Sequence, residues 1–262
     1  MYLVGRTTGY GFSVTDEGFA EMRSSGMSLI EHSLAQKIYY EPKMVAELAT
    51  RHDVKLWSCH LPHTPLNIND ASTLDNDLRK IVFDRYCLEI KKCADVGVNK
   101  FVMHPGTPFA DESERPERLK RATDFSVRIA DVAEQYGAVI AIEDMPHCIG
   151  RTIDEIESIV TADPRLRVCF DVNHLLNNTH DEFIDRLGSK IITVHFSDYD
   201  FVDERHHFPT DGKIPWVQLM RKLYGSGYKG PWIYECNKRE RSFQMCYDIA
   251  AGILKEAGVP EI

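Results

Sequence analysis

The stretch 137–174, GAVIAIEDMPHCIGRTIDEIESIVTADPRLRVCFDVNH, contains two short apolar runs with a helical segment between them. The first run, Val139–Glu143, and the second, Leu166–Asp171, each have the length of an ordinary strand. The first is almost wholly apolar, which is typical of a strand buried on both faces of a parallel sheet. Between them Asp154 is a candidate cap or first-turn acid of a helix, and Asp163-Pro164 breaks the chain before the second strand.

The same alternation of apolar runs and helical segments continues along the rest of the chain. Helical spacings of three and four recur, as in Phe83, Cys87 and Ile90, and Gly97 follows the end of that segment. We therefore predict an α/β protein, a single (β/α)8 TIM barrel that occupies residues 1–262 as one domain. Its eight strands are predicted at Tyr2–Arg6, Met27–His32, Val54–His60, Lys100–His104, Val139–Glu143, Leu166–Asp171, Ile191–Phe196 and Pro231–Glu235.

An open doubly wound sheet is compatible with the same order of elements, but two features disfavour it. No G-x-G-x-x-G or G-x-x-x-x-G-K-[ST] loop follows an early strand. Polar residues also recur at the ends of many strands rather than at one crossover. The chain shows no low-complexity segment or long linker that would divide it into domains.

The charge and the cysteine content limit the classes of function. The chain has 31 Lys+Arg and 40 Asp+Glu, a net charge of −9, which disfavours a protein that holds nucleic acid mainly by bulk charge. We expect no membrane helix, since no apolar run approaches about 18 residues, and no signal peptide. The seven cysteines are odd in number and form no C-x-x-C pair. They predict neither a disulfide framework nor a thiolate zinc site, and they favour a reducing cytoplasm.

Six consecutive predicted strands end in a histidine or a carboxylate. Active sites of barrels lie at the carboxyl ends of the strands, where such side chains converge on one axis. Gathered in a partly dry cavity, they require a compensating cation, and carboxylates with imidazoles suit Mn²⁺, Zn²⁺, Mg²⁺, Co²⁺ or Fe²⁺. Without thiolate ligands, an open catalytic site is favoured over a closed structural zinc site. The six residues are His60, His104, Glu143, Asp171, His195 and Glu235.

Each of these residues also has a plain structural interpretation. A single histidine at a strand end is more often a hydrogen-bonded structural residue than a metal ligand, and only the set in register favours a site. Glu31 and His32, at the end of the second strand, stay undecided. His63, His147 and His180 are interpreted as loop histidines.

The segment 198–212, which follows the seventh strand, is long and rich in potential ligands. A solvated charged loop and a lid that carries further metal ligands are both compatible with its sequence.

Several of these motifs, in this order, resemble the xylose-isomerase-like barrel superfamily, and within it the sugar phosphate isomerase/epimerase-type proteins. The motifs are His104-Pro105-Gly106, Ile142-Glu143-Asp144, Phe170-Asp171-Val172-Asn173-His174, His195-Phe196-Ser197-Asp198, Arg205-His206 through Gly212, and Tyr234-Glu235. The resemblance to the ketose 3-epimerase branch implies one metal ion held by Glu143, Asp171, His195 and Glu235. It also implies that the two glutamates exchange a proton on opposite faces of a substrate carbon, while His174 and Arg205 touch substrate oxygens.

A second branch of the superfamily, the endonuclease-IV-type apurinic-site nucleases, holds three zinc ions on a larger ligand set. Residues that match the additional ligands are present as well, with Glu204 in place of an aspartate; they are His60, His104, His174, Glu204 and His206. The acidic net charge and the lack of Arg/Lys-rich loops with intercalating aromatics disfavour DNA as the substrate.

The sequence therefore predicts a metal-dependent isomerase or epimerase of a small sugar, a sugar phosphate or a related polyol ketone. Glu143 and Glu235 would remove and return a proton α to the carbonyl, through an enediolate, with His174, Arg205, His104 and His60 as substrate contacts. A dehydratase of an inositol-type ketone shares the same first step. The alternative is an endonuclease-IV-type zinc phosphodiesterase acting on abasic DNA, and a sugar-binding barrel without catalysis is a weaker third. The expected partner is a small molecule rather than a membrane or nucleic acid, and a homo-oligomer stays open.

Overall fold

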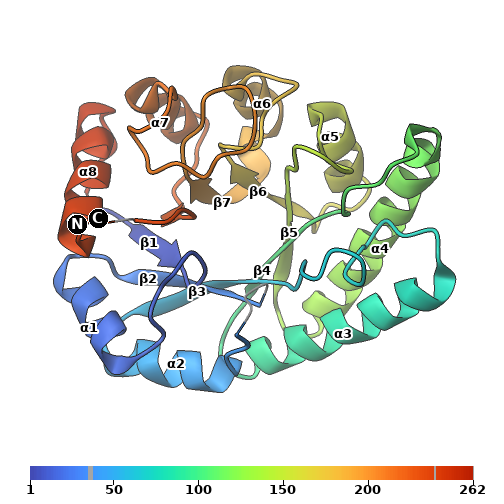
Figure 1. The fold of residues 1–262 in the computed structure, drawn as a ribbon, viewed down its shortest axis with the longest axis horizontal. Coiled ribbons are helices and arrows are strands. Elements are labelled where there is room, and N and C mark those ends of the chain that lie inside the picture. The colour runs from blue at the N-terminus through green and yellow to red at the C-terminus, as the bar shows by residue number, and fades with distance from the viewer. Residues whose placement is uncertain (35–37, 239, 262) are drawn as a thin grey trace.

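The structure, a computed structural model, describes residues 1–34, 38–238 and 240–261. Within these ranges eight parallel strands pair in chain order, and β8 pairs with β1, so the sheet closes into a barrel (Figure 1). The strands are β1 Val4–Thr7, β2 Leu29–Ser33, β3 Lys55–His60, β4 Lys100–Met103, β5 Val139–Glu143, β6 Arg167–Asp171, β7 Ile191–Phe196 and β8 Trp232–Tyr234.

An α-helix follows each strand and packs on the outside of the barrel, as Figure 1 shows. Two short 3₁₀ turns, Glu112–Glu114 and Gly188–Lys190, adjoin the fourth and sixth helices. Among the described residues, none of the helices combines the length and the apolar character that a bilayer crossing demands. The helices are α1 Asp16–Ser24, α2 Pro42–Arg51, α3 Asn76–Ala94, α4 Arg115–Glu134, α5 Ile153–Thr161, α6 His180–Leu187, α7 Trp216–Gly225 and α8 Phe243–Glu256.

The predicted (β/α)8 barrel is confirmed, and each strand begins and ends within two residues of its predicted bounds. The helix α5 illustrates why the local sequence decides its ends. Thr152 caps it by accepting a hydrogen bond from the backbone N–H of Glu155, and Asp154 lies in the first turn, where the helix dipole favours a negative charge. Gly97 and Gly137 adopt positive φ angles after the ends of α3 and α4, which a residue without a Cβ does at little cost.

The apolar core has two parts, one outside the barrel sheet and one inside it. Residues such as Ile140 and Phe170 belong to the large cluster between the strands and the helices. Val102, Ala141 and Cys169 form a separate small cluster. Because side chains alternate between the two faces of a strand, the residue two positions after each member of this small cluster faces the same barrel interior. Those next residues are His104, Glu143 and Asp171, so the strand period itself delivers polar groups to the carboxyl end of the barrel.

Candidate metal centre

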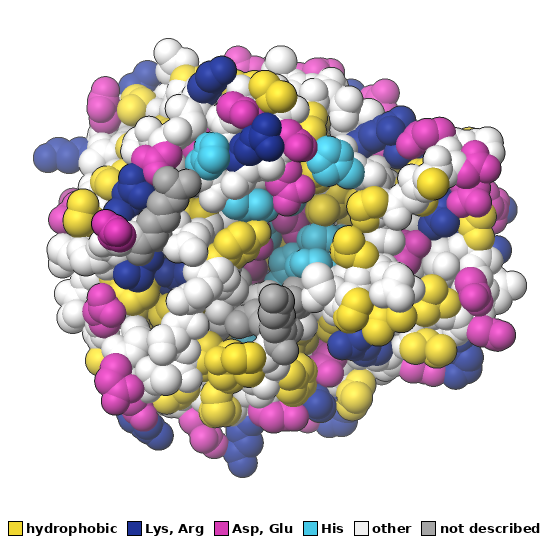
Figure 2. Space-filling view, viewed as in Figure 1, with side chains coloured by type: hydrophobic (Ala, Val, Ile, Leu, Met, Phe, Trp, Pro, Cys, Tyr) yellow, Lys and Arg dark blue, Asp and Glu magenta, His cyan; other side chains and the backbone are white. Residues whose placement is uncertain are grey.

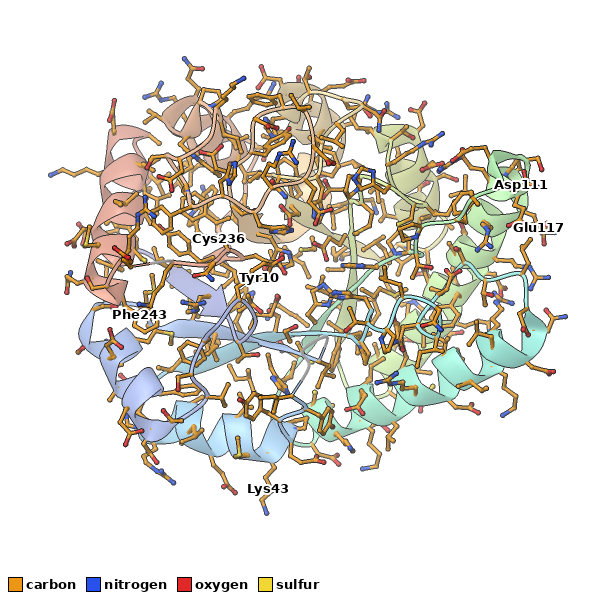
Figure 3. The ribbon with its side chains drawn as sticks, in the orientation of Figure 1. Tyr10, Lys43, Asp111, Glu117, Cys236 and Phe243 are labelled. Atoms are coloured by element: carbon orange, nitrogen blue, oxygen red, sulfur yellow. The ribbon has the colours of Figure 1, made fainter. Side chains whose placement is uncertain are left out.

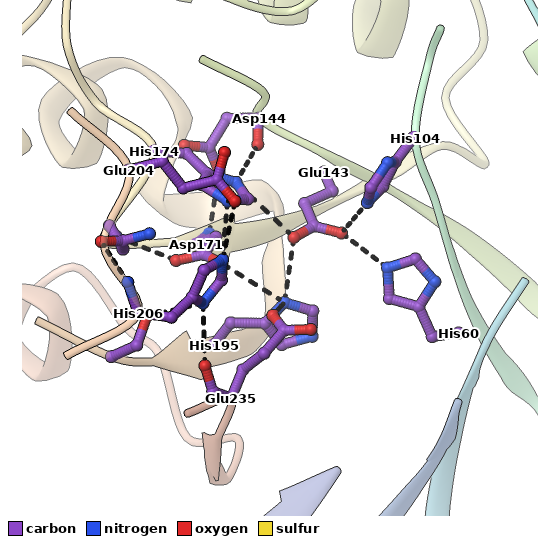
Figure 4. Close-up of polar contacts among 12 residues, drawn as sticks. His60, His104, Glu143, Asp144, Asp171, His174, His195, Glu204, His206 and Glu235 are labelled. Carbon is purple, nitrogen blue, oxygen red and sulfur yellow. Dashed lines mark hydrogen bonds and ion pairs between the residues drawn. The ribbon is translucent and has the colours of Figure 1, made fainter. Parts of the chain in front are cut away.

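Three carboxylates, two at the ends of β5 and β6 and one directly after β8, converge on one ring nitrogen of His195 (Figure 4). The Nδ1 atom of His195 lies 3.0 Å from Oε1 of Glu143, 2.5 Å from Oε2 of Glu235 and 3.8 Å from Oδ2 of Asp171. All four side chains are buried. A single ring N–H satisfies one acceptor, so this arrangement leaves buried negative charge that a cation would compensate. The ligand atoms lie within 4.8 Å of one another.

The other ring nitrogen of His195 is held by a residue that the sequence left undecided. Nε2 of His195 lies 3.0 Å from Oε1 of the fully buried Glu31, and Oε2 of Glu31 accepts a hydrogen bond of 2.6 Å from Ser58. A carboxylate in this position fixes the tautomer that presents Nδ1 to the centre. Glu31 therefore orients His195 without itself lying at the centre.

Glu143 links this quartet to a group of histidines on β3 and on the segments that follow β3 and β4. Its Oε2 atom lies 2.9 Å from Nε2 of His60 and 3.2 Å from Nε2 of His104. The ring of His63 stacks on that of His104, with centroids 4.1 Å apart and an angle of 12° between the planes. His60, His63 and His104 form a second group of potential ligands, and Glu143 lies between it and the quartet.

A third group of potential ligands surrounds Asp171 and consists of side chains from the loops after β6 and β7. Nε2 of His174 lies 3.4 Å from Oδ2 of Asp171 and 3.6 Å from Oε1 of Glu204, which also lies 2.8 Å from Nε2 of His206. Asp171, His174 and His206 place their ligand atoms within 4.8 Å of one another. The nine side chains matched in the sequence to a three-metal set are thus brought together in three adjoining groups.

Three of these histidines share one hydrogen-bond pattern. Nδ1 of His60 pairs with the carbonyl of Leu61, Nδ1 of His174 with that of Asp144, and Nδ1 of His206 with that of Glu235, at 2.8 to 2.9 Å. A carbonyl only accepts, so each Nδ1 carries the proton and Nε2 faces the carboxylates. Metal-ligating histidines almost always donate their second N–H in this way.

The buried polar atoms show that the residues present fit a divalent cation. Oδ2 of Asp171 and Nε2 of His174 are buried, lie 3.4 Å from each other and form no hydrogen bond among the described residues. Such atoms are costly unless an ion or a ligand satisfies them. Carboxylate oxygens and imidazole nitrogens are the donors that Mn²⁺, Zn²⁺, Co²⁺ and Fe²⁺ accept.

The pKa values of the buried acids and histidines also indicate that positive charge stabilises this site. Burial opposes ionisation of Glu235, but the adjacent His195 outweighs it and lowers the pKa of Glu235 to about 2. Burial also lowers the pKa of His60, but the hydrogen bond to Glu143 outweighs that and raises the pKa to about 9. Burial raises the pKa of Asp171 to about 6. A cation close to a buried carboxylate favours the ionised form, which burial alone disfavours.

Residues 19–257 match the family described as the xylose isomerase-like TIM barrel. The chain belongs to this family. An uncharacterised protein of Methanocaldococcus jannaschii is 26% identical over 205 residues, which cover 73% of this chain and 69% of that protein. A probable endonuclease 4 of Acholeplasma laidlawii is 27% identical over 188 residues, 64% of this chain. The match spans 63% of that endonuclease, less than two thirds of its length.

The barrel also resembles solved structures over nearly its whole length. A crystal structure described as a D-tagatose 3-epimerase-like protein superposes with a TM-score of 0.85 and covers 98% of both chains, at 22% sequence identity. This likeness establishes the xylose isomerase-like fold.

In this member of the xylose isomerase-like family, the segment after β7 folds back onto the centre. The buried carboxylate of Asp198 organises it by accepting hydrogen bonds from the backbone N–H groups of Tyr199, Thr210 and Ile214 and from the indole of Trp216, at 2.8 to 3.1 Å. The side chain of Asn173 accepts from the N–H groups of residues 205 and 206. The segment is thus anchored rather than solvated, and it carries Glu204 and His206 to the third group.

Not every residue singled out in the sequence reaches the centre. Arg205 directs its guanidinium to carboxylates of its own loop, 3.1 Å from Asp200 and 3.6 Å from Asp203. His147 pairs with Asp203 at 2.9 Å. His180 is the first residue of α6 rather than a loop residue, and its Nε2 pairs with the carbonyl of Val172 at 2.7 Å. A substrate contact by Arg205 stays a prediction.

Tyr10, which the sequence analysis missed, lies against the centre from the loop after β1 (Figure 3). Its ring is 5.0 Å from that of His206, and 38% of the surface of Tyr10 stays exposed. Tyr10 adopts a φ of 51°, a conformation that is uncommon outside glycine. The buried Arg6 donates to the carbonyls of Gly9 and Tyr10 and so supports this strained loop. The flanking glycines of Gly9-Tyr10-Gly11 were the signal that could have found it.

Proposed function

We propose that this protein is a divalent-metal-dependent isomerase or epimerase of a small ketose or related polyol ketone. The observation that carries the proposal is the convergence of Glu143, Asp171 and Glu235 on Nδ1 of His195 at the carboxyl end of the barrel. Glu143 comes from β5, and Glu235 follows β8, which pairs with β1. A ketose bound between them would meet a carboxylate from each side, as proton exchange at a carbon next to the carbonyl requires.

The two glutamates differ in how free they are to move a proton. Both oxygens of Glu143 are engaged, one by His195 and the other by His60 and His104. Among the described residues Glu235 has one such partner, His195, whose Nδ1 lies 2.5 Å from Oε2 of Glu235. We therefore assign the first proton abstraction to Glu235 and the return of the proton to Glu143.

The remaining residues bind and orient. A divalent cation, when bound, supplies Lewis acidity that stabilises negative charge developing on the substrate oxygens. Glu143, Asp171, His195 and Glu235 would hold it. His174, fixed through the carbonyl of Asp144, would orient a substrate hydroxyl.

The known proteins that resemble this chain support the same class. The D-tagatose 3-epimerase-like protein shares the fold, and a fructoselysine 3-epimerase of Escherichia coli O157:H7 is 38% identical over 48 residues, 18% of each chain. Both names describe exchange at a carbon of a ketose, which is the chemistry proposed for Glu235 and Glu143.

The proposal is tested by solvent deuterium exchange with Glu235→Gln. The wild-type protein, loaded with Mn²⁺, is expected to exchange a carbon-bound hydrogen of at least one member of a broad panel of ketoses and ketose phosphates. Glu235→Gln should lower that exchange by about 10²–10⁴-fold or more, the usual contribution of a general base. Glu89→Gln, at a buried glutamate of α3 that accepts from Tyr39, is the matched control and should exchange normally. A wild-type protein without exchange on the whole panel refutes the proposal.

A specific observation also favours a second candidate, metal-assisted phosphodiester hydrolysis. Glu143 bridges the histidine group and the quartet, and Asp171 borders the third group, so the geometry suits two or three closely spaced ions. Several of the sequence relatives are probable endonucleases 4.

Metal content separates the two candidates. The isomerase predicts one ion per chain, retained when His60 and His104 are both replaced by alanine. About three zinc ions per chain, loss of more than one in the double variant, and nicking of a duplex with one abasic site would favour the phosphodiesterase.

A further inference from the structure

A pocket of about 230 Å³ adjoins the metal centre on the side of His104. Its walls come from the loops that follow β3, β4, β5 and β7, all at the carboxyl end of the barrel. In Figure 2 hydrophobic side chains border the histidines in the central hollow of this face. Neither proton transfer nor the four central ligands make use of this pocket.

The pocket wall is mainly apolar. Leu66, Pro108, Met145 and Pro146 contribute hydrocarbon surface, and His63, stacked flat on His104, contributes a ring face. Leu66 keeps 46% of its surface exposed at the rim. An apolar ligand group that covers this surface would be stabilised, because the contact removes hydrocarbon from water.

The pocket lies directly beside the centre, because His104, which lines it, is 3.2 Å from Glu143, and Glu204, which also lines it, is 3.6 Å from His174. Its volume exceeds the roughly 150 Å³ cavity that is sufficient for benzene. It falls short of the roughly 300–1,000 Å³ that a whole drug-sized ligand occupies. The pocket therefore has room for a substituent, while the reacting part of the same molecule lies at the centre.

The charges around the pocket disfavour an anionic substituent. Glu204 lines it directly, and His147 on its wall is paired with Asp203. A phosphate placed here would face these carboxylates and lose hydration against apolar surface, which is costly.

We propose that this pocket binds an uncharged aryl or alkyl group carried by the sugar substrate, so that a sugar with such a substituent binds more tightly than the free monosaccharide or its phosphate. The inference rests on the proposed function only in taking the molecule bound at the centre to be a sugar. An aromatic ring would lie against the face of His63 and contact Leu66 and Met145.

The test measures binding rather than turnover. Isothermal titration calorimetry compares the α- and β-anomers of phenyl glucopyranoside with the corresponding methyl glucopyranosides, none of which has a free carbonyl. At least one phenyl compound is expected to bind about tenfold or more tightly than its methyl counterpart, since a hydrophobic pocket gains that factor from small apolar groups. Leu66→Ser and Met145→Ala should each reduce this preference. Ile81→Ser, an equivalent change at an exposed residue of α3, should leave it intact.

The binding experiment tests the pocket, and the deuterium-exchange experiment tests the proposed isomerase activity, so the two proposals can fail independently. Equal binding of phenyl and methyl compounds, or a preference that survives both pocket variants, overturns the proposed subsite. A phenyl preference in a protein that exchanges no carbon-bound hydrogen supports the subsite and refutes the isomerase. Deuterium exchange with a ketose, combined with equal binding of phenyl and methyl glucosides, supports the isomerase and refutes the subsite.

Discussion

Glu31 shows how a residue outside the ligand set decides what the centre can hold. It is fully buried, accepts from Ser58 and faces Nε2 of His195 across the barrel interior. A negative charge here holds the proton on Nε2 and makes Nδ1 a stronger ligand, because the imidazole shares charge with its hydrogen-bond partner.

Replacing Glu31 by glutamine is therefore expected to weaken Mn²⁺ or Zn²⁺ binding by about 10–100-fold, the usual effect of removing such a partner. Competition with a chromogenic chelator measures the affinity. Glu89→Gln removes a buried carboxylate away from the centre and is expected to bind metal as the wild type does. Unchanged affinity in the Glu31 variant would mean that His195 needs no such partner.

At this scale the sequence predicted that the strand-end side chains converge, but it did not predict the residues that support them. His60, Glu143 and His195 were found because a barrel brings the ends of its strands together. Glu31 also lies on a strand, but its role depends on a partner 164 positions away, and no local pattern reports that pairing. Tyr10 reaches the centre from a loop, and loop paths have no periodicity that the sequence reveals.

At the scale of elements, the segment after β7, residues 198–212, depends on side-chain contacts more than any strand or helix of the barrel does. It contains no helix or strand, only one β-bridge between Asp198 and His207. The side chain of Asp198 therefore holds the backbone of this segment in place through hydrogen bonds, as a ladder of backbone hydrogen bonds does in a strand. Gly212 packs against this carboxylate. A Cβ at Gly212 would lie 2.2 Å from Oδ1 of Asp198 and 2.5 Å from the carbonyl oxygen of Tyr199.

Gly212→Ala is consequently expected to displace the segment, and Glu204 and His206 with it, while the barrel stays folded. Limited proteolysis should show faster cleavage between residues 198 and 212, with an unchanged far-ultraviolet circular dichroism spectrum. Gly225→Ala, at a helix-end glycine where a Cβ meets nothing within 4 Å, is the control. Wild-type proteolysis of Gly212→Ala would contradict the role assigned to Asp198.

The strands and helices were predictable for a reason that does not apply to this segment. A strand such as β5 is encoded by its own apolar residues, and a helix such as α5 by its cap and first-turn acids. Whether residues 198–212 are solvated or anchored depends on Asp198 meeting Trp216 and on Asn173 meeting the backbone at residue 205. Those contacts exist only once β6 and β7 are paired.

For the whole molecule, the converging carboxylates imply that stability depends on metal. Buried like charges repel in the folded state and separate on unfolding, so a cation that binds only the folded barrel stabilises it. At a free metal concentration about 100-fold above Kd the gain is about 2.7 kcal/mol. For a chain of this size that corresponds to roughly 5–10 °C in Tm.

Calorimetry of the protein after dialysis against a chelator, and again with Mn²⁺ or Zn²⁺ restored, is expected to show a shift of this size. Glu143→Gln, which removes the bridging carboxylate, should show a much smaller shift. Identical Tm values with and without metal in the wild type would indicate that the barrel does not bind these ions.

The order in which the barrel is assembled limits when the centre can come into being. His60 is the earliest of the nine converging side chains in the chain and Glu235 the latest, and β8 must pair with β1 across more than 200 residues to bring Glu235 into place. A ribosome delivers these segments one after another, and domains fold as units. The growing chain therefore lacks a complete centre until its last strand has emerged. The metal proposed for this centre would therefore bind only after β8 has emerged, and the metals available at that time would select the ion, since selectivity in cells depends on availability more than on raw affinity.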